Sequence, residues 1–310
     1  MSIETVPDSG YYSISNVSVQ SSITTATDDT VSIQKMPDYT YFRSLWWTEG
    51  NIHPEAKWEE AKLPYVLVEG VTLEEYERRT DEFNVHGLWE WTNYKVSVYE
   101  LPLKPHETCI SAIIKYFNKS CGDADDTNAR IIGFGATRTR DDNSGKEADA
   151  SFRPRKPRVP APSGSDGENE PWPNIVVEVA CSESIDHVFE KVKNYWLMDF
   201  SRVHDAIVIK IDPVPENRMP SRMQAWHFCS RNRIRRGADL PHRTHFEFGT
   251  HDGAGNPLNI PRGVCLIKID LDCLYYQARS DVRIPRHILP DPIVLDFSII
   301  REEIFYAYDV

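Results

Sequence analysis

The sequence lacks any long hydrophobic run. No stretch of its 310 residues approaches the roughly 18 consecutive apolar residues of a membrane span. The first residues also lack the basic start and continuous apolar stretch of a secretory signal peptide. A compact basic run, which would favour the nucleus over the cytoplasm, is missing as well. We therefore expect a soluble intracellular protein, cytoplasmic or nuclear, with no membrane partner.

Closely spaced cysteine pairs are also missing. The chain has six cysteines and none belongs to a C-x-x-C pair: Cys109, Cys121, Cys181, Cys229, Cys265 and Cys273. This spacing suggests neither a zinc site nor a disulfide framework. It favours free thiols buried in a core.

Positive charge is scarce, with 35 Lys and Arg against 47 Asp and Glu and a net charge of −12. Such a balance argues at first against a nucleic-acid partner. Most of the acidic excess, however, lies in residues 1–104. The remainder contains two basic clusters, over Arg153–Arg158 and over Arg231–Arg243. Each cluster can meet phosphates locally, or it can be a solvated loop.

What the chain does contain is the pattern of one α/β domain. Residues 1–40 are rich in Ser, Thr and Asp and lack periodicity, which predicts a disordered or loosely attached arm. Residues 41–212 are expected to form the core, and 213–310 a C-terminal extension packed on the same domain. Within the core, periodicity and turn residues predict helices over 71–83, 106–121 and 183–198, a strand or hairpin over 88–101, and strands over 129–137, 147–154, 174–180 and 206–212. Thr72 is placed to cap the first of these helices, with Glu75 three residues on. Beyond 213, the strand-like runs are HFEFGTH, VCLIKIDLDCLYY and PIVLDFSII.

One charged residue stands inside the most apolar of these strands. Residues 174–180 read NIVVEVA, which is typical of a strand buried on both faces. A buried carboxylate is costly unless it is paired, protonated or bound to a metal. Glu178 therefore needs a partner. A salt-bridged arginine would satisfy it, and so would a second carboxylate that shares a cation with it.

Two nearby residues could complete such a site. Asp149 lies in the preceding predicted strand, and Mg²⁺ is typically held by one or two carboxylates with waters and substrate phosphate. Lys191 lies in the following helix, with Tyr195 one turn later on the same face. Its ammonium could position a water or neutralise a phosphorane-like transition state. It could also be a solvated surface lysine, for which Lys193 is the better candidate.

Taken in order, five segments resemble the PD-(D/E)XK nuclease superfamily, and most closely its Uma-two-like branch of restriction endonucleases. They are VTLEEY, LWEWTNYKVSVYELPLKPHE, EADASFRP, PNIVVEVACSES and KVKNYW. Their order and their helix and strand context carry the resemblance, which covers about residues 71–212. It implies an α/β (α+β) fold with a restriction-endonuclease-like core, in which helices flank a central mixed sheet. It does not explain the arm or the region beyond 213.

The resemblance also implies an active site. It makes Asp149 the motif aspartate and Glu178 the first residue of the E-x-K element, whose third position here is Ala180. Lys191 matches the position on the following helix from which this branch supplies its lysine. Asp149, Glu178 and the backbone carbonyl of Val179 would hold Mg²⁺ or Mn²⁺.

Further site residues follow from the same resemblance. Glu107 matches an acid that the first helix of the family often contributes, and it would be a fourth catalytic residue. Glu90 is a second possibility, similar to the Y-E-L glutamate of the family. His106 could touch a phosphate or cap a helix. The Arg153–Arg158 cluster could hold a nucleic-acid backbone without reading its sequence.

The function implied is metal-dependent hydrolysis of nucleic-acid phosphodiester bonds, with DNA expected ahead of RNA. A homodimer would allow two sites to cut both strands. Two alternatives stay open. The missing E-x-K lysine and the acidic charge favour a catalytically inactive nucleic-acid- or protein-binding module. In an effector-like interaction protein, the arm and the aromatic-rich segment 41–58 would carry the function instead.

Overall fold

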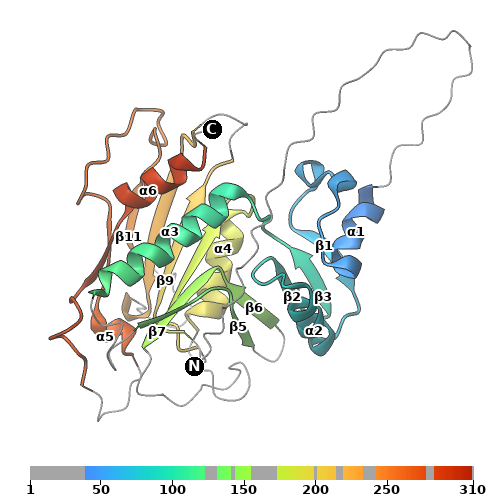
Figure 1. Cartoon of the computed structure of the whole chain (residues 1–310), viewed down its shortest axis with the longest axis horizontal. Helices are drawn as coiled ribbons and strands as arrows, with labels where there is room; N and C mark the ends of the chain where they lie inside the picture. Colours follow the sequence, from blue (N-terminus) through green and yellow to red (C-terminus); the bar gives the residue numbers. More distant parts are fainter. Residues whose placement is uncertain are drawn as a thin grey trace, which may run out of the picture. The chain divides into compact units, whose positions relative to one another are not determined.

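A central six-stranded mixed sheet flanked by helices organises the chain, which is seen here in a computed structural model (Figure 1). The predicted α+β class is therefore confirmed. The structure describes residues 39–122, 131–140, 144–154, 173–198, 201–213, 219–232, 242–276 and 283–308. The predicted arm lies outside these residues, except that Tyr39 and Thr40 begin the first helix. Within the described part, no helix has the length and apolar character that a membrane crossing requires.

The N-terminal part of this fold is built around tryptophan. Its elements are α1 (Tyr39–Glu49), the short turns η1 (Pro54–Ala56) and η2 (Trp58–Glu60), β1 (Tyr65–Glu69), α2 (Leu73–Phe83), β2 (Trp89–Thr92) and β3 (Lys95–Val98). Trp46 contacts Trp58 and Trp89 with ring centroids 5.2 and 5.9 Å apart. These buried aromatic pairs form the centre of a separate apolar cluster.

Two local predictions in this part are confirmed. The side chain of Thr72 caps helix α2, with its Oγ1 accepting a hydrogen bond from the Glu75 N–H at 3.2 Å. The run 88–101 is a hairpin whose turn residues, Asn93 and Tyr94, both have positive φ. No strand was predicted at β1, whose segment was expected to be a loop carrying aromatic anchors.

The predicted strands 129–137 and 147–154 are wrong as single strands. Each breaks into two, giving β4 (Ile131–Phe134), β5 (Thr137–Arg140), β6 (Ser144–Ala148) and β7 (Ala150–Pro154). Strands β5 and β6 join the small antiparallel sheet, in the order β1-β3-β2-β6-β5. Strands β4 and β7 join the large sheet. The chain therefore changes sheets at Asp149, the one residue between β6 and β7.

The large sheet has the order β11-β10-β9-β8-β7-β4. It contains β8 (Ile175–Ala180), β9 (Asp205–Ile211), β10 (Met223–Cys229) and β11 (His242–Glu247) in addition to β4 and β7. Strands β8 and β9 run parallel, while the other neighbours are antiparallel. Every residue of β8 is buried, as its apolar composition predicted.

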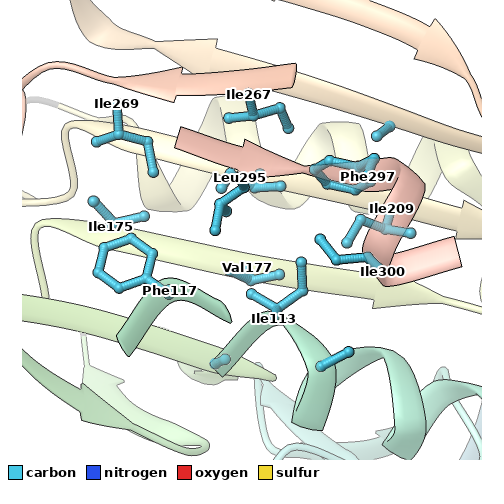
Figure 2. Close-up of a cluster of buried hydrophobic side chains, with 14 of the residues drawn as sticks. Ile113, Phe117, Ile175, Val177, Ile209, Ile267, Ile269, Leu295, Phe297 and Ile300 are labelled. Atoms are coloured by element: carbon cyan, nitrogen blue, oxygen red, sulfur yellow. The ribbon is translucent and has the colours of Figure 1, made fainter. Parts of the chain in front are cut away.

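Helices cover both faces of this sheet (Figure 1). Alternate residues of β8, such as Val177 and Val179, face α3 (Lys104–Ser120) and α6 (Phe297–Tyr306). Figure 2 shows this core, in which Ile113 and Phe117 of α3 pack with side chains of the sheet and of the C-terminal region. The intervening residues of β8 face α4 (Ile185–Lys191), which continues as the π-helical turn η4 (Val192–Trp196).

The region 213–310 completes the same core. Strands β10 and β11 extend the large sheet, while β12 (Leu266–Ile269), α5 (Leu271–Leu274), β13 (Ile293–Asp296) and α6 pack over one face. Strand β10 was not predicted from the sequence, because its buried residues do not alternate with exposed ones. The run PIVLDFSII is half strand and half helix, because Asp296 caps α6 by accepting from the Ser298 N–H.

Candidate active site

Asp149 occupies the bend between the two sheets. Its Oδ2 accepts a hydrogen bond from the Val179 N–H at 2.6 Å, beyond the last pair of the β7–β8 ladder, Ala150 with Val177. This contact holds Asp149 against β8 at the residue that follows Glu178. The charge of Asp149 is near enough to raise the pKa of the Glu178 carboxyl. The two acids that the sequence singled out therefore lie near each other.

The carboxylate of Glu178 is buried on the α4 face of β8. Its side chain is 2 % exposed, its Oε1 accepts from the indole N–H of Trp196, and its Oε2 lies 2.8 Å from the Lys191 ammonium. Burial raises the pKa of Glu178 to about 8, reinforced by the charges of Asp149 and Glu183 and opposed by Lys191. The Glu178 carboxyl therefore favours its protonated form below about pH 8.

Lys191 reaches this site from α4. Its side chain is 6 % exposed, and its ammonium lies 2.9 Å from Glu90 Oε1 as well as 2.8 Å from Glu178 Oε2. Burial disfavours the charged amine, but the carboxylates of Glu178, Glu183 and Glu90 outweigh it and hold the pKa of Lys191 well above its usual range. Lys191 is therefore a charged buried lysine, and the solvated alternative for it is wrong.

The local path of the helix explains how the lysine and its neighbours face inward. The backbone changes from α-helix to π-helix directly after Lys191. Insertions of this kind occur mostly as single turns and often at functional sites. The π turn brings Tyr195 and Trp196 both to the buried side, where the Tyr195 hydroxyl lies 2.9 Å from Thr139 Oγ1. Trp196 thereby reaches Glu178.

Glu90 of β2 brings the small sheet into the site. It lies close to two lysines, since Lys146 of β6 donates to its Oε2 and Lys191 lies beside its Oε1. Burial raises the pKa of Glu90, but the charges of Lys146, Lys191 and His187 outweigh this and hold it well below its usual range. Glu90 is therefore an ionised partner of both lysines.

A second group of ligand-type side chains adjoins Glu90. Glu90, Glu183 and His187 offer ligand atoms within 4.8 Å of one another. The His187 ring stacks on Tyr99 with centroids 3.7 Å apart, and its Nδ1 is hydrogen-bonded to Glu183 Oε1. Because lysines already balance both oxygens of Glu90, this group is less suited to a cation than the Asp149 and Glu178 pair.

Glu100 holds the loop that leads from β8 into α4. Its carboxylate accepts from the backbone N–H groups of Cys181 at 2.6 Å, of Ser182 at 2.9 Å and of Glu183 at 3.0 Å. The Tyr-Glu-Leu triplet of this chain is residues 99–101, so Glu100, rather than Glu90, stands in the position that the Y-E-L comparison describes. Its contacts fix the backbone that carries Glu183 and α4.

His106 and Glu107 approach Asp149 from the start of α3. His106 is buried, with its Nε2 3.5 Å from Asp149 Oδ1 and its Nδ1 2.9 Å from Glu107 Oε1. Burial works against the charged ring, but Asp149 and Glu107 outweigh it, and the pKa of His106 is well above its usual range. The Glu107 side chain is 57 % exposed, and it is joined to Asp149 through His106.

The predicted phosphate-holding cluster is only partly within the described residues. Arg153 is buried in β7, and its guanidinium lies 4.9 Å from the centroid of Phe134. This packing does not suit a residue that meets a phosphate at the surface. Arg155, Lys156 and Arg158 lie outside the described residues, as do most members of the Arg231–Arg243 cluster.

The residues around Asp149 fit a hard divalent cation. The two carboxylates supply the oxygen ligands that Mg²⁺ prefers. In a strand, the N–H and C=O of one residue face the same neighbour, so the Val179 carbonyl faces the side on which its N–H meets Asp149. The buried His106 Nε2 faces Asp149 Oδ1 at 3.5 Å, which is long for a hydrogen bond. It is suited to a water or phosphate oxygen beside Asp149.

Comparisons with known proteins add little to this geometry. No family model matches the chain. No curated protein matches either. Among solved structures, one match is a protein from Anabaena variabilis ATCC 29413, described as "a putative nuclease belonging to DUF820". The match has 13 % sequence identity and a TM-score of 0.39, and it covers 70 % of this chain and 90 % of that one. A likeness this distant carries no argument about the site.

Sequence reasoning missed several residues that surround Lys191. Glu183 lies just before the Ser184 cap of α4, and His187, four residues on, lies in the first turn of that helix. That spacing was a usable signal. Lys146 gave no comparable signal, because it joins Glu90 only through the pairing of β2 with β6.

Proposed function

We propose that this chain is a metal-dependent nuclease that hydrolyses phosphodiester bonds, with DNA as substrate ahead of RNA. The observation that carries the proposal is the contact of the Lys191 ammonium with Glu178, 2.8 Å from its Oε2, with Asp149 hydrogen-bonded to the next residue of β8. Lys191 would supply from the helix the charge that Ala180 does not. The PD-(D/E)XK assignment and the Uma-two-like branch belong to this proposal.

Each residue has a role that its chemistry supports. Asp149, Glu178 and the Val179 carbonyl would hold Mg²⁺ or Mn²⁺, which when bound supplies water activation and neutralises charge on the scissile phosphate. Lys191 would orient the attacking water and stabilise the developing negative charge. His106 would donate to a phosphate oxygen, and Glu107 would fix the orientation of the His106 ring.

The deciding experiment is a cleavage assay. Supercoiled plasmid, linear duplex DNA and single-stranded RNA would be incubated with the full chain and Mg²⁺ or Mn²⁺, with EDTA as the metal-free control. We expect nicking of DNA that EDTA abolishes and that Glu178→Gln lacks. A matched control is Glu190→Gln on the exposed side of α4, which should cut like the parent. Equal cutting by Glu178→Gln, or none by the parent, would sink the proposal.

One observation favours a second candidate, the catalytically inactive binding module. Both oxygens of Glu178 already have partners in Trp196 and Lys191, and Glu90 has two lysines. Such an ion network can hold a fold together without any metal. A parent chain that shifts labelled DNA in a gel, yet cuts nothing with either metal, would favour this candidate.

A further inference from the structure

Four buried side chains with metal-binding chemistry meet at the edge of the core away from Glu178. His204, Asp205, Cys229 and Cys273 each offer one ligand atom, and these atoms lie within 4.8 Å of one another. All four residues are less than 3 % exposed. The six cysteines are buried and unpaired as disulfides, as predicted. Because the sequence has no C-x-x-C pair, it gave no sign that Cys229 and Cys273 lie close together in the fold.

Three separate elements build this cluster. Asp205 is the first residue of β9 and pairs directly with Cys229, the last residue of β10. His204 precedes Asp205, and its backbone N–H donates to Asn174 O at 2.8 Å, which anchors it to the sheet. Cys273 comes from α5, a helix of only four residues. The positions are therefore set by the sheet register and by the packing of α5.

The distances match a tetrahedral zinc site. Cys229 Sγ lies 3.9 Å from Cys273 Sγ and 3.6 Å from His204 Nδ1. With Zn–S bonds of about 2.3 Å and Zn–N bonds of about 2.0 Å, tetrahedral ligands lie about 3.8 Å apart for two sulfurs and about 3.6 Å for sulfur and nitrogen. Asp205 Oδ2 lies 2.8 Å from His204 Nδ1, so these two atoms would separate by about 0.5 Å to reach a tetrahedral ligand spacing of about 3.3 Å.

The surroundings supply the support that metal ligands usually have. His227 is fully buried, and its Nε2 lies 2.6 Å from Asp205 Oδ1, so it can hold the second oxygen of that carboxylate. Two arginines, Arg231 and Arg243, lie close enough to the two thiols to interact with them electrostatically. Thiolates and imidazole are the ligands that select zinc over Mg²⁺ or Ca²⁺.

We propose that His204, Asp205, Cys229 and Cys273 bind one structural Zn²⁺ ion that tethers α5 to the large sheet. Four protein ligands leave no open position, as in structural rather than catalytic zinc sites. The site is separate from the candidate active site. Asp205 pairs with Ile175 at the start of β8, and Glu178 stands three residues further along that strand, roughly 10 Å away.

The test measures metal in the full chain. Protein purified with a reductant and dialysed against metal-free buffer should retain equimolar zinc by inductively coupled plasma mass spectrometry. Replacing the zinc with Co²⁺ should give the thiolate-to-cobalt charge-transfer band and the intense d–d bands of a tetrahedral site. This spectrum needs no variant, so it stands even where a substitution impairs folding.

Variants then locate the ion. Cys229→Ser and Cys273→Ser should each lower zinc content by about tenfold or more. Cys265→Ser is the matched control, a buried thiol outside the cluster, and should bind like the parent. The double variant Asp149→Asn, Glu178→Gln should also retain zinc, which separates this inference from the proposed nuclease site.

Three results would overturn the proposal. The first is a parent chain with neither equimolar zinc nor a thiolate-to-cobalt band. The second is retention of zinc by both Cys229→Ser and Cys273→Ser. The third is a disulfide between Cys229 and Cys273 in peptide mass spectra of the freshly purified chain, because a disulfide has no thiolate to offer a metal.

Discussion

The Lys191 ammonium lies 2.8 Å from Glu178 Oε2, joining helix α4 to the central strand β8. The same ammonium lies 2.9 Å from Glu90 of the small sheet. One buried cation therefore links three elements, two of which belong to different sheets. Lys191 in this position can contribute both to the free energy of unfolding and to the proposed cleavage reaction. The two contributions therefore need separate measurements.

Replacing Lys191 with methionine should reduce both stability and cleavage. Removing one partner of a buried ion pair leaves an uncompensated charge and destabilises a protein by about 3–5 kcal/mol. Urea denaturation should show a loss of this size, whereas Lys193→Met, two residues further on, should change stability by less than about 1 kcal/mol.

A double variant separates the two roles of Lys191. Above about pH 8, where Glu178 is ionised, Lys191→Met combined with Glu178→Gln removes both charges, so it should recover part of the lost stability while cutting no DNA. If the double variant regained cleavage, or if the two stability losses simply added, Lys191 would not act through Glu178.

Asp149→Asn should abolish cleavage without unfolding the chain. The asparagine amide oxygen can still accept the hydrogen bond from the Val179 N–H, but it carries no charge for a cation. A metal site supplies several kcal/mol to catalysis, so the rate should fall by about 100-fold or more. Thermal denaturation should show a folded chain with a lower melting temperature, because the buried His106 ring loses the carboxylate that favours its charged form. Normal cleavage by Asp149→Asn at low Mg²⁺ would contradict the assignment of this residue as a ligand.

Stability in EDTA should fall as pH rises from about 5 to 8. The pKa of Glu178 is raised to about 8 from an ordinary value of 4.5, so its contribution is fully present below 4.5 and is lost as pH rises through 8. The slope should approach about 1.4 kcal/mol per pH unit for one proton. Urea midpoints across this range measure it.

The control for this pH dependence is Glu178→Gln. That variant has no carboxyl to titrate, so its stability should depend less steeply on pH between 5 and 8, although the raised pKa of His106 leaves some slope. Identical pH profiles for parent and variant would show that Glu178 ionises normally.

Removing zinc should lower the melting temperature through α5. A ligand that binds only the folded state stabilises it by about 4 kcal/mol at a thousandfold excess over its Kd. A zinc-selective chelator should therefore destabilise the parent and speed amide hydrogen exchange in residues 271–276. Added Mg²⁺ should not restore protection. Cys273→Ser should already behave like the chelated parent, and a chelator without effect on the parent would contradict this prediction.

Much of the fold followed from local sequence pattern. The apolar run of β8, the periodicity of α3 and the Thr72 cap of α2 were all correctly predicted, since each depends on neighbours within a few residues. The same logic singled out Glu178, because a charge in a buried strand is costly wherever the strand lies. Asp149 and Lys191 were predicted as site residues because they lie in the elements directly before and after the strand that carries Glu178.

Only the tertiary structure decided which distant residues meet. Glu90 and Lys146 join Lys191 because β2 pairs with β6, and no local period encodes that pairing. The sheet change at Asp149 likewise depends on the partners that β6 and β7 find on either side. Cys229 and Cys273 come together through strand register and the docking of α5. Sequence alone thus determined the buried acid that needed a partner, while strand order and packing decided which partners it has.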